Sequence, residues 1–425
     1  MISMRSLKGE ITIPGDKSIS HRAVMIGSLA KGTTHIHGFL NGADCLSTID
    51  CMRKLGVEID YSKDHPSFVT VKGAGLSGLK APTETLYTGN SGTTTRIISG
   101  LLSAQPFESR IDGDSSIRKR PMKRIMDPLS LMGANISSEQ NNGCAPLIIR
   151  PSVLHGISYE SPVSSAQVKS AIIMAALYAS GKTVITEPSR SRDHTELMLS
   201  SFGADIISEG NTVTVSPCKE LFSQEITIPG DISSAAFFLV AAAITKNSEI
   251  LIKNVNINET RAGILKVLEA MGASLSIQNE RLLSGEKTAD LLIKSSELHS
   301  TTISGDIIPT LIDELPVIAV MAAYALGKTV IKDAAELRVK ESDRILSISE
   351  NLKAMGADVE ATPDGMVING GKPLHSSRIS TKKDHRIAMA FYTASLPLDE
   401  MNSLDDTDCV NISYPGFFSD MESLY

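Results

Sequence analysis

One phrase occurs twice in this chain, about half the chain length apart, and this duplication limits the folds that the chain can adopt. ITIPGDKSIS spans Ile11–Ser20 and ITIPGDISS spans Ile226–Ser234, and each copy opens an apolar run. A repeat on this scale indicates a protein built from a duplicated unit. Lys17 and Arg22 of the first copy are replaced by isoleucine and phenylalanine in the second. The scaffold therefore does not need these cations, and an anionic ligand is the simplest reason for them.

A second pattern marks smaller units within each half of the chain. A helical stretch ends in a glycine and is followed by β-prone residues, which predicts a helix cap and then a strand. The five segments with this pattern are Lys54–Ile59, Leu131–Ile136, Ser201–Ile206, Ala270–Leu275 and Ala354–Val359. Each unit therefore reads as strand, helix, strand, helix and further strands. A sixth, degenerate unit would fit His375–Tyr425, with its helix at Arg386–Ser395.

Six units with a strong duplication at the fourth predict an α/β protein of two domains, each with three units. We expect the first domain at residues 14–225. The second takes residues 226–425 together with an N-terminal strand at 1–13. The duplicated phrases would then mark the two crossings of the chain between the domains.

Composition excludes several classes of protein. The net charge of −7 argues against a general nucleic-acid binder. The longest apolar stretches are too short to span a bilayer, and the N-terminus lacks the apolar core of a signal peptide. We therefore expect a cytoplasmic protein with no nucleic-acid or membrane partner. The odd number and scattered positions of the cysteines indicate reduced thiols without metal-ligand spacing: Cys45, Cys51, Cys144, Cys218 and Cys409.

Cationic and glycine-rich segments precede several of the expected helices. Gly15–Ala23 (GDKSISHRA) carries Lys17 and Arg22 at a helix start, and Thr88–Arg96 (TGNSGTTTR) is a second such turn. Unpaired N–H groups at a helix start bind phosphate or carboxylate, although a plain capped helix explains either segment alone. Arg118–Arg124 (RKRPMKR) is a dense basic run without the aromatic residues of a nucleic-acid surface.

The internal copies serve as controls for one another. Alignment of YASGKTVI with YALGKTVI makes Gln167 coincide with Asp313, and Lys169 with Leu315. Asp313 is a candidate catalytic carboxylate at the start of an apolar helix, or else an acid favoured there by the helix dipole.

Two further segments place cations together in the second half of the chain. RVKESDR holds Lys340 and Arg344 at i and i+4, where like charges repel unless an anion lies between them. KKDHR places Arg386 at the start of an apolar helix. A salt-bridged surface helix explains the first segment alone. Several such segments in an acidic protein instead suggest one polyanionic site in a cleft between the domains.

The ordered set GDKSISHRA, TGNSGTTTR, RKRP, SSAQVKS, IDELP, RVKESDR and DHRIAMA resembles the 5-enolpyruvylshikimate-3-phosphate synthases (3-phosphoshikimate 1-carboxyvinyltransferases) over nearly the whole chain. The resemblance implies two domains of three βαβαββ units each. It implies a transferase of the shikimate pathway to chorismate and the aromatic amino acids. Such an enzyme moves the enolpyruvyl group of phosphoenolpyruvate to the 5-hydroxyl of shikimate 3-phosphate through a tetrahedral addition–elimination intermediate, and phosphate is released. No metal or organic cofactor is implied, and we expect a monomer.

The resemblance also implies roles for single residues. Those expected to bind shikimate 3-phosphate are Lys17, Ser18, Arg22, Ser164, Ser165, Gln167, Arg192, Asp313 and Lys340. Those expected to bind phosphoenolpyruvate are Lys17, Asn90, Gly92, Arg120, Gln167, Arg344, His385 and Arg386. The expected catalytic set is Asp313 as the base for the hydroxyl, Glu341 for proton transfer at the methylene carbon, and Lys340 and Lys17 beside them.

Three further expectations follow from this resemblance. Gly92 leaves room in the phosphoenolpyruvate pocket, which predicts sensitivity to the analogue glyphosate. Ligands that touch both domains should draw them together on binding. The chain departs from some members of the family at Ile412, where they carry a lysine, and at Glu336, where they carry an asparagine.

Two alternative functions remain open on the sequence. The UDP-N-acetylglucosamine enolpyruvyltransferases share the expected fold, but they generally carry a loop cysteine near an arginine–proline pair. Residues 112–124 contain no cysteine, and a Lys–Asn pair would be expected where Lys17–Ser18 stands. A non-catalytic binding protein built from similar repeats would explain the symmetry and the basic segments. It would not explain why Asp313 and Gln167 differ at equivalent positions.

Overall fold

The structure, a computed structural model, describes residues 6–425 and divides the chain into two compact units. Unit 1 comprises the described residues up to Pro14, together with Pro229–Leu282 and Lys287–Tyr425. Unit 2 comprises Gly15–Ile228 and the hairpin tip Leu283–Glu286. The expected domain limits and the expected closure on ligand binding stay predictions.

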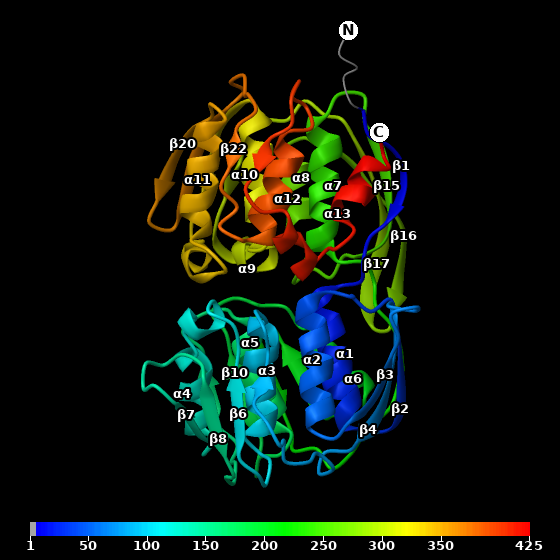
Figure 1. Ribbon diagram of the computed structural model, residues 1–425, viewed down its shortest axis with the longest axis vertical. Coiled ribbons are helices and arrows are strands. Elements are labelled where there is room, and N and C mark those ends of the chain that lie inside the picture. Colours follow the sequence, from blue (N-terminus) through cyan, green and yellow to red (C-terminus); the bar gives the residue numbers. More distant parts are fainter. Residues whose placement is uncertain (1–5) are drawn as a thin grey trace. The chain divides into compact units, whose positions relative to one another are not determined.

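Unit 2 contains three sheets, each with mixed parallel and antiparallel strands (Figure 1). In each, a parallel pair at one edge is followed by two antiparallel strands. The first sheet runs β13 (Leu221–Phe222), β2 (Ala30–His37), β4 (Phe68–Ala74), β3 (Glu58–Tyr61), with β14 (Glu225–Thr227) beside β2. The second runs β5 (Leu86–Tyr87), β6 (Ser109–Asp112), β8 (Leu147–Arg150), β7 (Asn135–Ser138). The third runs β11 (Ile206–Glu209), β12 (Thr212–Val215), β10 (Thr183–Thr186), β9 (Ser158–Glu160).

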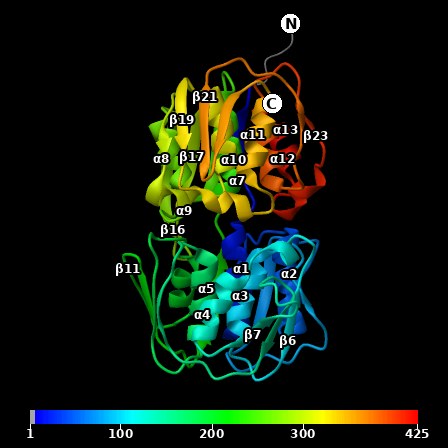
Figure 2. The ribbon, with the colours of Figure 1, turned by 90° about the vertical axis from the view of Figure 1, so that its left-hand side faces the viewer.

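Six α-helices accompany these sheets. They are α1 (Lys17–Leu29), α2 (Ala43–Lys54), α3 (Gly92–Leu102), α4 (Lys123–Leu131), α5 (Ala166–Ala176) and α6 (His194–Ser201). The order of elements through the second and third sheets is βαβαββ, which confirms the expected unit. Helices α3 and α5 lie directly against each other, as Figures 1 and 2 both show.

Unit 1 repeats this plan with one weak member. Its sheets run β1 (Lys8–Thr12), β15 (Glu249–Asn256), β17 (Glu286–Lys294), β16 (Ser274–Leu283), and β18 (Thr302–Ile303), β19 (Gly327–Ile331), β21 (Gly365–Gly370), β20 (Asp358–Thr362). The third is the short pair β22 (Arg378–Ile379) and β23 (Ser403–Leu404), which matches the expected degenerate unit. The helices are α7 (Ile232–Ile244), α8 (Gly263–Ala270), α9 (Ile308–Leu311), α10 (Leu315–Tyr324), α11 (Arg344–Ala354), α12 (His385–Ala394) and α13 (Phe417–Glu422).

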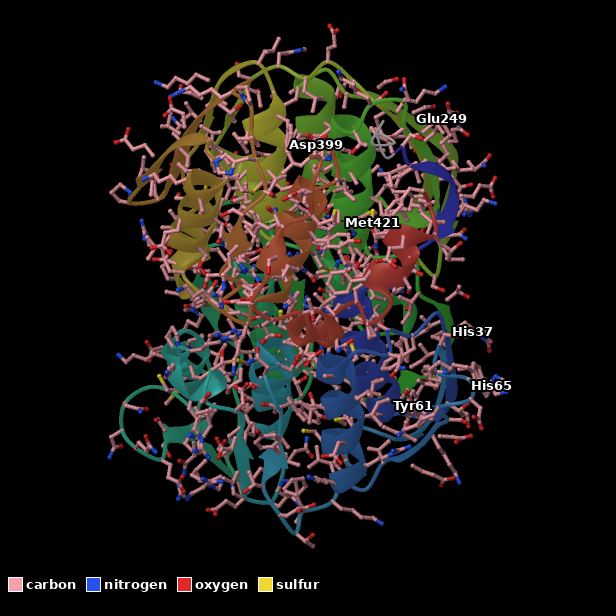
Figure 3. All side chains as sticks on the ribbon, turned by 45° about the horizontal axis from the view of Figure 1, so that its top comes forward. His37, Tyr61, His65, Glu249, Asp399 and Met421 are labelled. Carbon is pink, nitrogen blue, oxygen red and sulfur yellow. The ribbon has the colours of Figure 1, made fainter. Side chains whose placement is uncertain are left out.

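The duplicated phrase lies where the chain changes units. The strand of the first copy, β1, pairs in parallel with β15 in unit 1, and the helix that follows, α1, belongs to unit 2. The strand of the second copy, β14, pairs in parallel with β2 in unit 2, and α7 belongs to unit 1. The ion pair between His37 and Glu225 joins the same two strands at 2.6 Å, and Figure 3 labels His37 there. The chain thus passes between the two units within each copy of the phrase, at residues 14–15 and 228–229.

All five glycine signatures end a helix as predicted. Gly56, Gly133, Gly203, Gly272 and Gly356 each follow a helix and each has a positive φ, between 80° and 96°. A side chain is strained in this left-handed region, which is why glycine stands at this position after a helix. A strand begins within three residues of each of these glycines.

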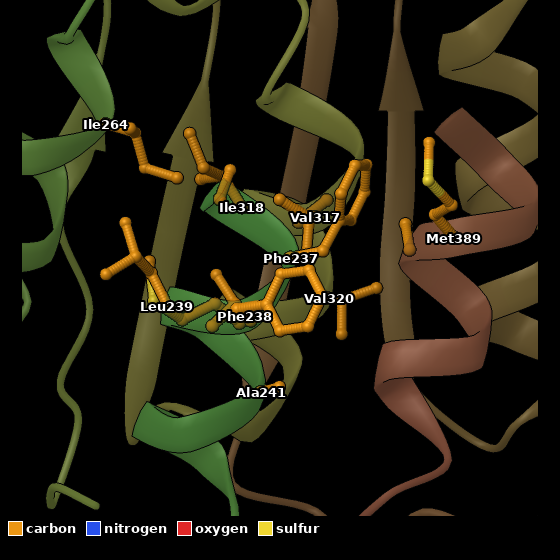
Figure 4. Packing of buried hydrophobic residues seen from close by; sticks show 14 of the residues in the cluster. Phe237, Phe238, Leu239, Ala241, Ile264, Val317, Ile318, Val320 and Met389 are labelled. Carbon is orange, nitrogen blue, oxygen red and sulfur yellow. The ribbon is translucent and has the colours of Figure 1, made fainter. Parts of the chain in front are cut away.

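Each unit has its own apolar core. In unit 1, α7, α10 and α12 pack together, and Figure 4 shows Phe238 of α7 beside Val320 of α10, with Met389 on α12. In unit 2, α3 packs between α1 and α5. The buried cations Arg22, Arg96 and Lys169 lie in the first two turns of α1, α3 and α5, and the later turns of these helices are mainly apolar. In residues 6–425, no single helix is long and apolar enough to cross a membrane. One pair of helical segments bent by 111°, Gly305–Leu311 with Leu315–Tyr324, has the length and apolar composition of a membrane span, and these two properties are its only resemblance to one.

Candidate active site

The start of α1 carries the first expected cation. Asp16 caps the helix by accepting a hydrogen bond from the Ile19 N–H (3.0 Å), and Lys17 follows as the first helical residue. Lys17 forms an ion pair with Asp44, which lies in the first turn of α2. The ammonium of Lys17 is therefore held beside two helix N-termini, α1 and α2, whose positive dipole ends favour an anion.

Arg22 lies one turn further along α1 and is almost fully buried. Its Nε donates to Thr195 Oγ1 (2.6 Å), its Nη2 to Ser170 Oγ (2.8 Å) and its Nη1 to the Ser18 carbonyl (2.9 Å). Burial lowers the pKa of Arg22 to about 10, which leaves it charged at neutral pH. Arg22 thus joins α1, α5 and α6 in addition to any contact it makes with a ligand.

The expected serines and Gln167 lie at the start of α5. Ser164 Oγ lies 2.9 Å from Ser189 Oγ, and the Ser165 N–H donates to Glu187 Oε1 (2.9 Å). Arg192 Nη1 reaches Ser18 Oγ at 3.5 Å. The loop after β9, the loop after β10 and the start of α1 therefore meet, and they bring together the residues expected to bind shikimate 3-phosphate in unit 2.

The start of α3 carries the expected phosphoenolpyruvate residues of unit 2. Arg120 Nη2 donates to Asn90 Oδ1 (3.1 Å), and Asn90 in turn donates to Asp114 (2.7 Å). A Cβ added at Gly92 would lie 2.8 Å from Arg96 Nη1 and 3.1 Å from Arg120 Nη1. Gly92 therefore lies directly beside two guanidinium groups.

Arg96 is a residue that the sequence reasoning missed as a site residue. Its Nη1 donates to Gln167 Oε1 (2.5 Å), and Gln167 Nε2 donates to Thr93 Oγ1 (3.0 Å). Arg96 lies four positions after Gly92 on the same helix, so the helical period places both on one face. That spacing could have identified it.

In unit 1, Arg344 is the centre of a second charged cluster. This guanidinium is buried and donates to Glu341 Oε2 (2.7 Å) and to Asp384 (2.8 and 3.1 Å). Asp313 Oδ1 lies 3.5 Å from Arg344 Nη1 and 3.5 Å from Lys340 Nζ. The structure therefore brings together Asp313, Lys340, Glu341 and Arg344, all of which were expected at the site.

Asp384 was not among the expected residues. It is fully buried, caps α12 and accepts a hydrogen bond from the Arg386 N–H (3.0 Å). Burial alone would raise the pKa of this carboxyl, but the Arg344 guanidinium outweighs that effect and holds the pKa below its ordinary value. The same pairing raises the pKa of Arg344 against the opposing effect of burial. Asp384 thus fixes Arg344 and also sets the first turn that carries His385 and Arg386.

Two further features of the site region concern Ile412 and possible metal ligands. Ile412, one of the positions expected to depart from some family members, ends a short 3₁₀ helix, Asp408–Ile412, and packs against the core of unit 1. Among residues 6–425, no group of three or more His, Cys, Asp or Glu side chains could hold a metal ion.

Comparison with known proteins identifies the family. The profile described as "EPSP synthase (3-phosphoshikimate 1-carboxyvinyltransferase)" matches residues 3–421. The 3-phosphoshikimate 1-carboxyvinyltransferase of Oceanobacillus iheyensis is 50% identical over 419 residues, 99% of this chain and 97% of that protein. Its counterpart from Brevibacillus brevis is 51% identical over 413 residues, 97% of this chain and 96% of that protein. The 2.37 Å structure of EPSP synthase from Acinetobacter baumannii superposes with a TM-score of 0.88 at 45% identity, covering 99% of this chain and 96% of that one. The two alternative functions are not favoured, and the chain belongs to the EPSP synthase (3-phosphoshikimate 1-carboxyvinyltransferase) family of transferases.

Proposed function

We propose that the charged clusters of the two units serve one reaction, the enolpyruvyl transfer carried out by this family. In it, the 5-hydroxyl of shikimate 3-phosphate adds to C2 of phosphoenolpyruvate as C3 gains a proton. The tetrahedral intermediate then loses a proton from C3 as the C2–O bond to phosphate breaks. No enzyme nucleophile is needed, and what the protein must supply is charge neutralisation and proton transfer.

The first requirement is to hold two anions together. Each substrate carries a phosphate and a carboxylate, and two unit charges about 4 Å apart repel by about 4 kcal/mol at an effective dielectric constant near 20. Lys17, Arg120, Arg344 and Arg386 are proposed to offset this repulsion, because arginine binds planar anions in a bidentate manner. Figures 1 and 2 show α1, α11 and α12, whose starts carry Lys17, Arg344 and Arg386, and Arg120 follows the 3₁₀ helix Ile117–Lys119.

The serine-rich loops of unit 2 are proposed to hold the shikimate 3-phosphate. Ser18, Ser164, Ser165 and Arg192 offer hydroxyl, backbone and guanidinium donors, which suit a phosphate group. Gln167 adds an amide at the start of α5, where it contacts Arg96 and Thr93. Arg22 is proposed to support the shikimate 3-phosphate site by holding its walls in place. Its three hydrogen bonds fix α1, α5 and α6 relative to one another.

The observation that carries the proposal is the pairing of two carboxylates with two cations in unit 1. Asp313, the proposed base for the hydroxyl, lies 3.5 Å from Lys340 Nζ, which favours its ionised form. Glu341 shares the Arg344 guanidinium with Asp384. An anionic substrate that takes over Arg344 Nη2 would leave Glu341 without this cation and so favour its protonated form. Glu341 can then donate a proton to C3 and later accept it back.

A phosphate-release assay tests this proposal. Purified protein should release inorganic phosphate only when phosphoenolpyruvate and shikimate 3-phosphate are both present, with neither substrate sufficient alone. UDP-N-acetylglucosamine in place of shikimate 3-phosphate should give no release. Release with that nucleotide sugar, or no release with the correct pair, would refute the assignment.

A further inference from the structure

Three charged side chains are enclosed in unit 2, away from the starts of α1 and α3. Lys169 on α5 is 2% exposed, and its Nζ lies 3.0 Å from Glu187 Oε2 and 2.8 Å from Glu196 Oε1. Both carboxylates are equally enclosed, at 3% and 4% exposure. The ammonium also donates to the Ser191 carbonyl (3.2 Å). None of the three belongs to the set of residues expected to touch a substrate.

Glu187 of this triad holds two loops that carry proposed substrate contacts, and Glu196 lies next to a residue that contacts Arg22. Glu187 Oε1 accepts the Ser165 N–H (2.9 Å) at the start of α5. Its Oε2 accepts the Ser191 hydroxyl (2.8 Å) and the Ser191 N–H (3.3 Å), one residue before Arg192. Glu196 lies in the first turn of α6, next to Thr195, which accepts from Arg22. The triad therefore links the serine loop, the Arg192 loop and the Arg22 helix contacts through one ammonium.

The repeat of the chain shows that the fold does not require this lysine. The equivalent position in the second half is Leu315, which is fully buried at the start of the apolar helix α10. The same helix packing is thus achieved with an aliphatic side chain. What differs is the loop that follows the next strand: after β10 it carries Ser191 and Arg192. Lys169 is therefore associated with the loop that carries Ser191 and Arg192, and the helix packing itself does not require it.

The free-energy cost of burying these charges also argues against a purely stabilising role for Lys169. Removing two carboxylates and one ammonium from water is expensive, and well-packed apolar residues in such positions often give equal or greater stability. The cluster has one excess negative charge, and Arg22 lies near enough for Glu196 to raise its pKa against the larger effect of burial. Lys169 nevertheless donates to the Ser191 carbonyl, and Glu187 accepts from Ser165 and Ser191, so these hydrogen bonds hold both loops. Glu196 contributes an ion pair to the same ammonium. The triad is therefore better explained by positioning than by stability.

We infer that Lys169, held between Glu187 and Glu196, is a positioning residue that fixes the Ser165 and Arg192 loops for the phosphate of shikimate 3-phosphate. This inference rests on the proposed function. Of the residues expected to bind phosphoenolpyruvate in unit 2, Asn90, Gly92 and Arg120 lie around the start of α3. Lys17 pairs with Asp44, and Gln167 on α5 contacts Arg96 and Thr93. None of these contacts involves the triad. The inference therefore predicts a selective loss of shikimate 3-phosphate affinity.

The test compares two variants that differ in buried charge. Lys169→Met removes the ammonium and leaves both carboxylates unpaired. Lys169→Met/Glu196→Gln lacks the ammonium but keeps the net charge of the cluster as it is in the unmodified protein. Displacements of about 1 Å at a binding site can lower activity by about a hundredfold, so we expect shikimate 3-phosphate to bind at least roughly tenfold more weakly to both variants. The KM for phosphoenolpyruvate should stay within about twofold of the unmodified protein, because α3 is undisturbed.

Met174→Ala is the matched control. Met174 is buried on the same helix and has no part in the triad, so this variant lowers stability by leaving a cavity. Its Kd for shikimate 3-phosphate, measured by calorimetry, should equal that of the unmodified protein. An equal loss of affinity in Met174→Ala and Lys169→Met would show that general destabilisation suffices and would overturn the inference. Unchanged affinity in the double variant would overturn it as well.

A separate readout keeps this inference distinct from the proposed function. Hydrogen exchange of backbone amides at residues 187–193, without any ligand, should be faster in Lys169→Met than in Met174→Ala. Unchanged exchange there would refute the positioning role even if catalysis were impaired. If the unmodified protein neither binds shikimate 3-phosphate nor releases phosphate, the proposed function fails, and faster exchange at 187–193 would still support control of this loop by Lys169.

Discussion

Replacing Asp384 with asparagine should remove one charge from the Arg344 cluster while keeping the helix cap. Asparagine caps helices about as well as aspartate, so the hydrogen bond from the Arg386 N–H to the side-chain oxygen is retained. The two contacts with Arg344, at 2.8 and 3.1 Å, lose their charged acceptor. Removing one partner of a buried ion pair costs about 3–5 kcal/mol. We expect the lower end, about 3 kcal/mol, because Glu341 remains 2.7 Å from Arg344.

Asp343→Asn is a control of the same kind on the neighbouring helix. Asp343 caps α11 through the Leu346 N–H (3.1 Å) and pairs with Arg338 at 2.7 Å, but both of these side chains are about one-third exposed. An exposed pair contributes about 0.2–1 kcal/mol, so this variant should lose less than about 1 kcal/mol. Both substitutions replace an aspartate with an asparagine. The difference between their losses of unfolding free energy therefore measures the effect of burying the ion pair.

Urea unfolding followed by circular dichroism measures both variants, and hydrogen exchange of the α12 peptides assigns the transition to unit 1. For domains of about 150–250 residues, a loss of about 3 kcal/mol corresponds to a fall in Tm of about 6–12 °C. Losses that agree within about 0.5 kcal/mol for Asp384→Asn and Asp343→Asn would refute the reasoning, because the buried pair would then be worth no more than the exposed one.

The ion pair between Asp384 and Arg344 also predicts how the stability of the protein changes at acid pH. The pKa of Asp384 is lower in the folded protein than its ordinary value, since Arg344 outweighs the effect of burial. Its contribution to stability is therefore complete above about pH 4, where the unfolded carboxyl is also ionised, and is lost as the pH falls through the folded pKa. The stability difference between the unmodified protein and Asp384→Asn should shrink below pH 4. A constant difference from pH 7 to pH 3 would contradict this.

Three shorter predictions concern the site and the fold. Asp313→Asn should lower kcat by about a hundredfold or more if this carboxylate is the base, and near-normal turnover would exclude that role. Gly92→Ala should raise the KM for phosphoenolpyruvate and weaken inhibition by glyphosate, because the new Cβ would lie 2.8 Å from Arg96 Nη1; equal kinetics would show that Arg96 can move aside. Burial opposes the charge of His194, but Glu286, 2.7 Å away, raises its pKa, so the stability that His194→Gln removes should be greater at pH 6 than at pH 9 in thermal unfolding.

Local patterns in the sequence predicted most of the fold because their causes are local. A glycine with positive φ after a helix needs only the residues on either side of it, and all five such glycines end helices. The helix expected at Arg386–Ser395 is found at His385–Ala394, and Asp384 caps it one residue earlier than expected. Both copies of the repeated phrase form a parallel strand followed by a turn and a helix, because the same local sequence adopts the same structure twice.

The partners of the candidate residues could not be predicted in this way. Lys340 and Arg344 were expected at i and i+4 of one helix, but Lys340 lies in extended backbone after the 3₁₀ helix Ala335–Val339, and α11 begins only at Arg344. Asp313 lies 3.5 Å from each of the two cations, and Asp384 joins Arg344 from 40 residues away. Arg96 meets Gln167 across 71 residues, between two different helices. No periodicity connects such positions, and only the packing of helices against one another brings them together. The sequence therefore predicted Asp313 and Glu341 beside the cations of unit 1. It missed Asp44, Asp384 and Arg96, which contact candidate residues from elsewhere in the chain.

The cations at helix starts and the carboxylates beside them are linked by the same electrostatic requirement. Lys17 and Arg344 are the first residues of α1 and α11, where the dipole of the helix is unfavourable to a cation. Each such cation that the structure describes in detail has an acidic neighbour: Asp44 for Lys17, and Asp384 and Glu341 for Arg344. These carboxylates stabilise the unliganded protein, and under the proposed function anionic substrates compete with them for the same cations. The affinity for substrate is thus set by the carboxylates as much as by the cations, and neutralising a carboxylate that leaves the fold intact should strengthen anion binding.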